Sequence, residues 1–234
     1  MNGLVIIPAR GGSKGVPGKN LKLLNGKPLL SYPIETAKAC KSINRIIVST
    51  DDEEIAAYAI SQGAEVIKRP PELSQDDSLV IDAIRYTLRE LKKEGYEADV
   101  VLLLEATSPI RSVENIEEAI EIIRAGKADT VTTITETDTS PGRLWSADNN
   151  DLQPYIAGSN PFLPRQKQPV AYRLTGQIYA FTPAGIERDL SSNRIIYGKI
   201  YPIITDGSTA LDIDTELDFL IAGEVLRQSE AGKN

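Results

Sequence analysis

The sequence predicts an α/β protein built around a mainly parallel β-sheet. Short apolar runs alternate with longer amphipathic segments along most of the 234 residues, which is the pattern of repeated strand–helix–strand units. Hydrophobic residues make up 41% of the chain and charged residues 25%, so the chain can bury a substantial core. We therefore expect one main domain over residues 1–234.

The expected elements follow in order along the chain. Runs rich in Val, Ile and Leu predict strands at residues 4–8, 45–49, 65–68, 100–104 and 130–135. Apolar residues at helical spacing predict helices at residues 28–41, 53–62, 79–94, 113–125 and 215–228. Ligands bind beyond the carboxyl ends of parallel strands, so one crevice is expected between four polar loops, at residues 8–20, 50–52, 69–77 and 105–111.

This rhythm breaks between residues 138 and 171. Five prolines and a run of polar residues make a regular helix or a central strand unexpected there. Leu144, Trp145, Tyr155 and Phe162 are nevertheless too apolar for a free linker. We expect an inserted arm that packs against a second copy of the chain, and a loop folded onto its own domain is the alternative.

Composition excludes several kinds of chemistry. Histidine is absent, which removes Ser-His-Asp catalysis, imidazole bases and His-ligated zinc. The single cysteine, Cys40, lies in a helical pattern and is expected to be a packing residue. The net charge of −7 argues against a nucleic-acid or anionic-membrane partner. No transmembrane run or signal-peptide pattern occurs, so we expect a cytoplasmic protein.

The first predicted strand runs into a glycine-rich cationic loop, IPARGGSKGVPGKN. Glycines let backbone N–H groups approach an oxyanion, and basic side chains add positive charge for a triphosphate. The loop supplies both, with Gly11, Gly12, Gly15, Gly18, Arg10, Lys14 and Lys19. It is not a P-loop, because Ser13 stands where that motif needs glycine and Asn20 replaces its hydroxyl residue. A solvated turn is the alternative.

Near the other end, the string ALDIDTELDF places two aspartates, Asp212 and Asp214, two residues apart. In an extended segment this spacing puts both carboxylates on one face, where they can hold a hard cation such as Mg²⁺. The alternative is a strand end that leads into a helix capped by Thr215. The presence of a cationic triphosphate loop in the same chain favours the metal site.

Two further strings carry polar groups toward the same crevice. LLLEATSPIR places Glu105, Thr107, Ser108 and Arg111 after a buried strand, where helix capping is the alternative role. LPRQKQPVAYRLTGQIYAF carries cations that either grip a carboxylate or solvate the arm. That second string places Arg165, Lys167 and Arg173 close to Thr175 and Tyr179.

Taken together, these strings resemble the acylneuraminate cytidylyltransferases, also called CMP-sialic acid synthetases. The resemblance runs from about Leu4 to Ala222 and rests on seven strings in the family's order: IPARGGSKGVPGKN, IIVSTDDEEIA, RPPELSQDD, LLLEATSPIR, PRQ, YRLTGQIYAF and DIDTELD. It implies a Rossmann-like three-layer fold of the nucleotide-diphospho-sugar transferase type, with the arm forming a homodimer interface. It also implies Mg²⁺-dependent transfer of CMP from CTP to a sialic or legionaminic-type acid, with release of pyrophosphate.

The resemblance assigns residues position by position. The nucleotide site would contain Arg10, Gly11, Gly12, Lys14, Lys19, Asn20 and Arg69, and Asp212 and Asp214 would hold the metal. Catalysis would depend on Arg10, Lys14, Lys19, Asp212 and Asp214. The sugar side would contain Glu105, Thr107, Ser108, Arg143, Arg165, Arg173, Thr175 and Tyr179, with some cations acting across the dimer interface.

The chain departs from the family pattern at two places on the sugar side. Glu105 stands where glutamine is usual, and Thr175-Gly176-Gln177 where Asn-Gly-Ala is usual. These departures leave open which nine-carbon acid is the substrate. Two other functions also stay open: a nucleotidyltransferase for another sugar, such as Kdo or a sugar 1-phosphate, and a nucleotide-binding protein without catalysis.

Overall fold

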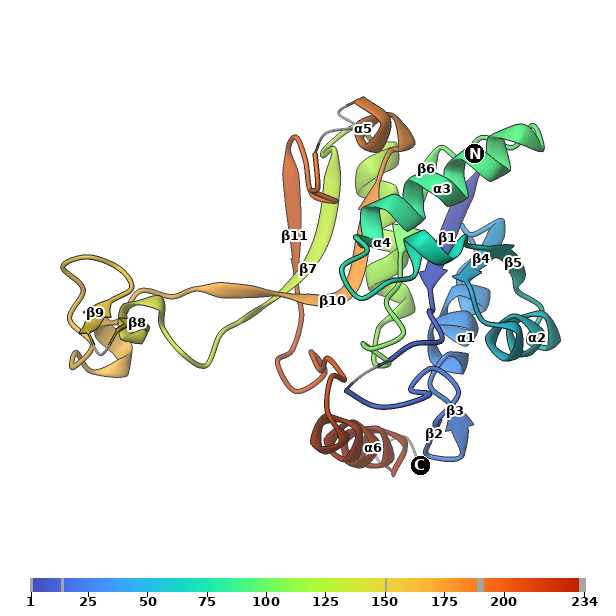
Figure 1. Cartoon of the computed structure of the whole chain (residues 1–234). Coiled ribbons are helices and arrows are strands. Elements are labelled where there is room, and N and C mark those ends of the chain that lie inside the picture. The colour runs from blue at the N-terminus through green and yellow to red at the C-terminus, as the bar shows by residue number, and fades with distance from the viewer. Residues whose placement is uncertain (1, 14, 150, 189–191, 232–234) are drawn as a thin grey trace.

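A seven-stranded sheet, in the order β11-β7-β10-β6-β1-β4-β5, forms the middle layer of the protein (Figure 1). The computed structural model describes residues 2–13, 15–149, 151–188 and 192–231. The strands of this sheet are β1 Gly3–Pro8, β4 Arg45–Thr50, β5 Glu65–Lys68, β6 Val100–Leu103, β7 Thr130–Glu136, β10 Tyr172–Phe181 and β11 Ile200–Ile204. Only β10 runs antiparallel to its neighbours, so the predicted mainly parallel sheet is confirmed.

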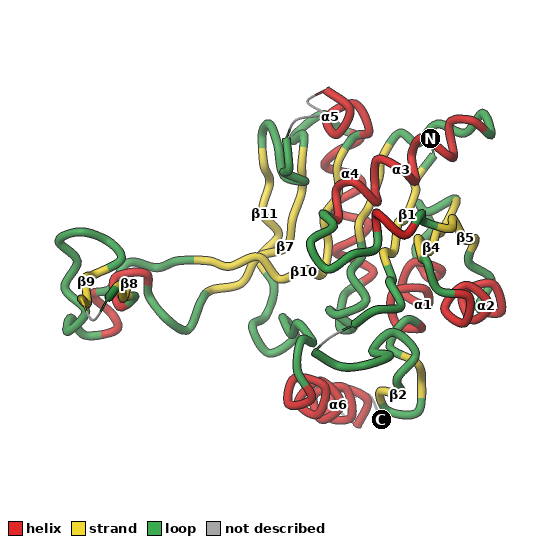
Figure 2. Tube along the Cα trace, in the orientation of Figure 1, coloured by secondary structure: helices red, strands yellow, loops and turns green. Residues whose placement is uncertain are grey.

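Helices cover both faces of the sheet (Figure 2). They are α1 Ser31–Ala39, α2 Glu53–Ser61, α3 Val80–Lys93, α4 Val113–Arg124, α5 Pro183–Arg188 and α6 Glu216–Ala231. Side chains alternate across a strand, so Val5 and Ile7 of β1 pack with α1, α2 and α4, while Leu4 and Ile6 pack with α3 and α5. The three-layer α/β architecture is therefore confirmed.

A third apolar cluster joins the two ends of the chain. Val16 of the glycine-rich loop and Ile213 are completely buried in it, together with Phe219 of α6. The cluster also contains residues of the small hairpin formed by β2 Leu23–Leu24 and β3 Lys27–Pro28. Because α6 packs here, the segment before α6 is held next to the glycine-rich loop (Figure 1).

Some predicted boundaries were wrong. The first helix begins at Ser31 rather than residue 28, because Lys27 and Pro28 form β3. Strands β10 and β11 were not predicted. Gly176 has a φ of +71° and lies where the register of β10 shifts, and Pro202 interrupts the apolar run of β11 at the sheet edge, so neither segment has a clean strand pattern.

The inserted arm projects away from the sheet between β7 and β10 (Figure 1). The arm occupies the region where the sequence pattern breaks, and its packing against a second copy of the chain stays a prediction. The arm contains a short hairpin of β8 Trp145–Asp148 and β9 Asp151–Pro154, and no central strand within its described residues. Its apolar side chains face solvent, with Tyr155 71% and Phe162 87% exposed.

Two further expectations concern Cys40 and membrane-spanning helices. Cys40 is buried directly after α1, and burial together with Glu117 and Glu114 raises its pKa to about 11. A thiol with this pKa stays protonated near neutral pH, which confirms its role as a packing residue. Among the residues described above, no helix has the length and apolarity needed to cross a membrane.

Candidate active site

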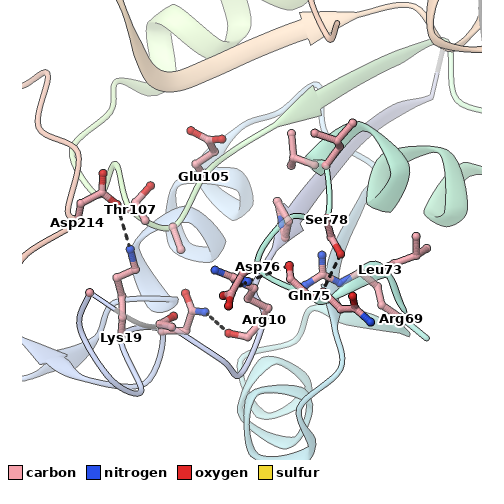
Figure 3. A pocket seen from close by; sticks show the side chains of 17 residues that line it. Arg10, Lys19, Arg69, Leu73, Gln75, Asp76, Ser78, Glu105, Thr107 and Asp214 are labelled. Carbon is pink, nitrogen blue, oxygen red and sulfur yellow. Dashed lines mark hydrogen bonds and ion pairs between the residues drawn. The ribbon is translucent and has the colours of Figure 1, made fainter. Parts of the chain in front are cut away.

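A cavity of about 350 Å³ lies beyond the carboxyl ends of β1, β5 and β6 (Figure 3). Its walls come from the loops at residues 8–20, 69–77 and 105–111, as predicted, and from Asp214 near the other end of the chain. The predicted loop at residues 50–52 supports the cavity from behind instead of lining it. There, Asp51 Oδ1 accepts a hydrogen bond from Gly11 N at 3.2 Å.

The cationic loop and the aspartate segment meet at one edge of this cavity. Lys19 Nζ lies 3.5 Å from Asp214 Oδ1 and donates a hydrogen bond to Ile213 O at 2.7 Å (Figure 3). The backbone N–H of Ile213 donates to Thr107 O at 2.9 Å. The predicted meeting of the two ends is therefore confirmed for Lys19 and Asp214. Lys14 lies outside the described residues.

Buried and exposed side chains alternate along the aspartate segment, which places both aspartates on the same side of it. Ile213 is buried, while Asp212 and Asp214 on either side of it are exposed. Thr215 and Asp218 then form a capping box, with Asp218 N donating to Thr215 Oγ1 at 3.2 Å and Thr215 N to Asp218 Oδ2 at 2.8 Å. The helix cap proposed as the alternative is thus present, and it stands beside the exposed aspartates without engaging their carboxylates.

Glycines allow close packing around this junction. A methyl group at Gly15 would collide with the carbonyl oxygen of Asp214, and one at Gly11 would lie 2.5 Å from Asp52 Oδ2. Gly18 has a φ of +62°, a conformation that glycine adopts without steric cost. Gly12 has open space around it. The loop therefore uses glycine for chain packing at two positions and for backbone conformation at one.

Arg10 is held by the loop that follows β5. Its Nη1 donates to Gln75 O at 2.9 Å and to Asp76 Oδ1 at 3.0 Å, and its own carbonyl accepts from Asn20 Nδ2 at 2.9 Å (Figure 3). Sequence reasoning did not single out Gln75 and Asp76, although both lie in a loop predicted to line the crevice. Asn20 shapes the glycine-rich loop from within.

Arg69 offers unused hydrogen-bond donors to the cavity. The residue is only 8% exposed, and its Nε and Nη2 atoms are buried without a hydrogen-bond partner in the part of the chain that the structure describes. Burial lowers its pKa, Asp51 opposes this and Arg10 adds to it. Buried unpaired donors are costly, so a cavity that contains them is suited to a ligand with acceptor atoms.

Glu105 forms the acidic part of the cavity wall. Burial and the neighbouring charge of Asp212 raise its pKa to about 7, with Arg111 opposing and Asp214 adding to the effect. Arg111 lies behind it and donates from Nε to Gln177 O at 2.9 Å and from Nη2 to the backbone carbonyl of Glu105. Burial lowers the pKa of Arg111 to about 9 against the effect of Glu105.

The other predicted sugar-side residues near the sheet are divided between the cavity and the interior. Thr107 lines the cavity. Ser108 is buried and donates to Thr175 O at 3.1 Å, while Thr175 Oγ1 bonds to Thr133 Oγ1 at 2.6 Å. Tyr179 is half-buried, and burial with the charges of Glu105 and Asp212 raises its pKa to about 12. The structure brings Thr107 to the cavity and places Ser108 and Thr175 in its supporting layer.

The three predicted sugar-side arginines do not line this cavity. Arg143 and Arg165 lie together at the arm, where Arg143 Nη2 donates to Leu163 O at 3.1 Å. Arg173 Nη2 donates to Ala210 O at 2.8 Å, close to the aspartate segment. Their assignment to the sugar therefore stays a prediction.

The chain is also similar in sequence to proteins of known families. A sequence profile described as "Cytidylyltransferase" matches residues 4–191. The chain is 35% identical over 231 residues to post-translational flagellin modification protein B of Campylobacter coli, covering 96% of this chain and 95% of that protein. It is 32% identical to the CMP-N,N'-diacetyllegionaminic acid synthase of Legionella pneumophila, covering 97% of each protein.

A longer relative and a solved structure extend the comparison. N-acylneuraminate cytidylyltransferase A of Danio rerio is 34% identical over 98% of this chain, which spans 52% of that protein's length. The fold resembles a CMP:2-keto-3-deoxy-manno-octonic acid synthetase complexed with CTP, with a TM-score of 0.71 at 17% identity over 98% of this chain and 100% of that one. On the profile match and the identity to full-length relatives, this chain belongs to the cytidylyltransferase family of nucleotidyltransferases.

Proposed function

We propose that this chain transfers CMP from CTP to the anomeric hydroxyl of a nine-carbon sugar acid of the sialic or legionaminic type and releases pyrophosphate. One observation carries the proposal. Lys19 and Asp214, from opposite ends of the chain, meet 3.5 Å apart at a cavity that Arg10 and Arg69 also line. This arrangement combines cations for a triphosphate with carboxylates for a divalent metal.

Two arguments support the choice of substrates. Cytosine presents adjacent acceptors, O2 and N3, which match the two unpaired buried donors of Arg69, whereas uracil carries an N3–H donor instead. For the sugar, the named relatives include an N-acylneuraminate cytidylyltransferase and a diacetyllegionaminic acid synthase. A nine-carbon 2-keto acid is the substrate class common to both.

The reaction is a single displacement at phosphorus. The anomeric oxygen forms a bond to the α-phosphorus of CTP, the bond from that phosphorus to the α,β-bridging oxygen breaks, and the hydroxyl proton passes to a base. Arg10 and Lys19 neutralise charge that develops on the phosphates, and the cavity orients the two reactants. Glu105, with a pKa of about 7, lines the cavity as a carboxylate able to accept the proton.

Asp212 and Asp214 would hold Mg²⁺. Their hard oxygen donors suit this ion, and both carboxylates lie close enough to Glu105 to add to the effect of burial in raising its pKa. Among the described residues no group of three or more acidic, cysteine or histidine side chains forms a complete cage, so phosphate oxygens would supply the remaining ligands. When bound there, Mg²⁺ would neutralise negative charge on the phosphates.

We further propose that the enzyme is a homodimer joined through the arm. Arg143 and Arg165 lie at the arm and away from the cavity of their own chain, so a carboxylate in that cavity can meet them only if a second copy supplies them. The exposed apolar side chains of the arm favour the same arrangement, because solvent-exposed clusters of this kind mark interfaces.

The decisive experiment measures pyrophosphate release with each of CTP, UTP, GTP and ATP. Each nucleotide is tested against a panel of 2-keto sugar acids and sugar 1-phosphates, with and without Mg²⁺. We expect turnover with CTP, a nine-carbon acid and Mg²⁺. Preference for another nucleotide, or for Kdo or a sugar 1-phosphate, would replace the proposed substrates. CTP binding without turnover on any acceptor would show a nucleotide-binding protein instead.

The metal assignment has its own test. Loss of a metal ligand removes several kcal/mol of transition-state stabilisation, so Asp212→Ala is expected to lower kcat by about a hundredfold or more. Asp206→Ala is the matched control, because Asp206 is also exposed and precedes the same segment but, unlike Asp212, is not among the charges that raise the pKa of Glu105 and of Tyr179. If Asp212→Ala turns over within about threefold of the parent, Asp212 is not a metal ligand.

A further inference from the structure

A buried amide connects the two loops that carry the cavity's acidic groups. Gln177 lies on β10 and is 2% exposed. Its Nε2 donates to Ile110 O at 2.7 Å and to Thr209 O at 2.9 Å, so both amide hydrogens are used. Ile110 belongs to the loop after β6 that contains Glu105, and Thr209 belongs to the segment that leads into the aspartates.

Three other contacts hold the same segment from other directions. Arg173, also on β10, donates to Ala210 O, Lys19 donates to Ile213 O, and Ile213 N donates to Thr107 O. Lys19 and Thr107 line the cavity, and a nucleotide in it would compete for the Lys19 ammonium. Gln177 does not line the cavity, so a ligand there would not compete directly for its amide hydrogens.

We propose that Gln177 is a positioning residue that fixes the segment carrying Asp212 and Asp214 against the loop after β6. The amide acts only through other residues, because it touches two backbone carbonyls and reaches no reacting atom. The metal part of this inference rests on the proposed function.

Further contacts of Gln177 support this brace. The orientation of the amide follows from its two partners, because Ile110 O and Thr209 O can only accept hydrogen bonds and so must face Nε2. Arg111 Nε donates to the backbone carbonyl of Gln177 at 2.9 Å, so the same residue is also tied to the loop after β6 through its main chain. Gln177 therefore ties the loop that carries Glu105 and the segment that leads to the aspartates to the same strand.

The test replaces Gln177 by methionine, which keeps the length of the side chain and removes both donors. Without nucleotide or metal, backbone amides in residues 206–214 are expected to exchange with deuterium about tenfold faster than in the parent. In the assay, the Mg²⁺ concentration for half-maximal rate is expected to rise about fivefold or more, while kcat at saturating Mg²⁺ falls less.

Thr130→Val is the matched control. Thr130 is fully buried at the opposite end of the sheet, where its Oγ1 donates to Tyr197 O at 2.8 Å. This control is expected to lower the thermal unfolding temperature while leaving exchange in residues 206–214 and the Mg²⁺ requirement as in the parent. Gln177→Asn, which can reach only one of the two carbonyls, gives an intermediate effect and replaces Gln177→Met if that variant does not fold.

Unchanged exchange in residues 206–214 of a folded Gln177→Met protein would overturn the proposal. Because exchange is measured without substrate, it decides the brace even if the proposed reaction fails. Faster exchange with an unaltered Mg²⁺ requirement would also overturn the positioning role, since the segment would then move without consequence for the metal.

Discussion

Gly15 shows how a single residue determines whether the two ends of the chain can meet. A methyl group here would collide with the Asp214 carbonyl oxygen, whereas one at Gly12 would meet nothing within 4 Å. Overpacking against backbone costs about 1–3 kcal/mol, so Gly15→Ala is expected to lower the free energy of unfolding by that amount. Gly12→Ala is the control and should change it by less than about 0.5 kcal/mol. Urea denaturation of both variants checks this, and equal effects would contradict the packing argument.

Glu105 should make stability depend on pH. Its pKa is raised from 4.5 to about 7, mainly by burial and secondly by Asp212, so the folded state binds more protons than the unfolded state between these values. Stability is therefore lost as pH rises through this window. Glu105→Gln removes the titrating group and should be the more stable protein above pH 7, by at most about 3 kcal/mol.

The measurement compares parent and Glu105→Gln by denaturant unfolding from pH 4 to pH 8 in the presence of a chelator. Only the difference between the two proteins is interpreted, because other carboxylates titrate in both. The stability advantage of Glu105→Gln is expected to be small near pH 4 and to grow until about pH 7. An advantage that is constant over this range would mean that the Glu105 carboxyl is not buried as described.

At the scale of elements, the sequence allowed correct predictions for segments whose residue pattern matches their burial in the structure. The glycine-rich loop and the Asp212-Ile213-Asp214 string were both recognisable, because each sets charged residues against buried apolar ones. Strand β10 was missed because Gly176 and a shift of register break its alternation. Arg69 was placed in the nucleotide site by resemblance alone. Its unpaired buried donors are visible only in three dimensions.

The α6 cap gives a prediction at this scale. Thr215 and Asp218 exchange hydrogen bonds at the start of the helix, and Asp218 Oδ2 also accepts from Asp214 N at 3.2 Å. Thr215→Ala should therefore lower the free energy of unfolding by about 1 kcal/mol, while Thr215→Ser, which keeps the hydroxyl, should lower it by much less. Thermal or urea unfolding of the two variants checks this. Equal losses would show that the threonine methyl group, and not the cap, stabilises the helix.

At the scale of the whole molecule, the site depends on contact between the segment before α6 and the glycine-rich loop near the N-terminus. The apolar cluster of Val16, Ile213 and Phe219 lies directly beneath the meeting of Lys19 and Asp214, so the core that fixes α6 also fixes the cavity. None of the described residues of the arm belongs to this core, and the arm leaves the sheet between β7 and β10. Body and arm are thus separable parts, and their roles can be tested separately.

Removing the arm tests the proposed dimer. Strands β7 and β10 are paired as far as Glu136 and Tyr172, and Thr137 N donates to Ala171 O at 2.9 Å, so a short glycine-rich turn can replace residues 138–170 without opening the sheet. The parent is expected to sediment as a dimer and the shortened chain as a folded monomer that still binds CTP. Turnover should fall steeply in the monomer, because Arg143 and Arg165 are removed with the arm. A parent that stays monomeric at micromolar concentrations, or a shortened chain that keeps full turnover, would show that each cavity is complete within one chain.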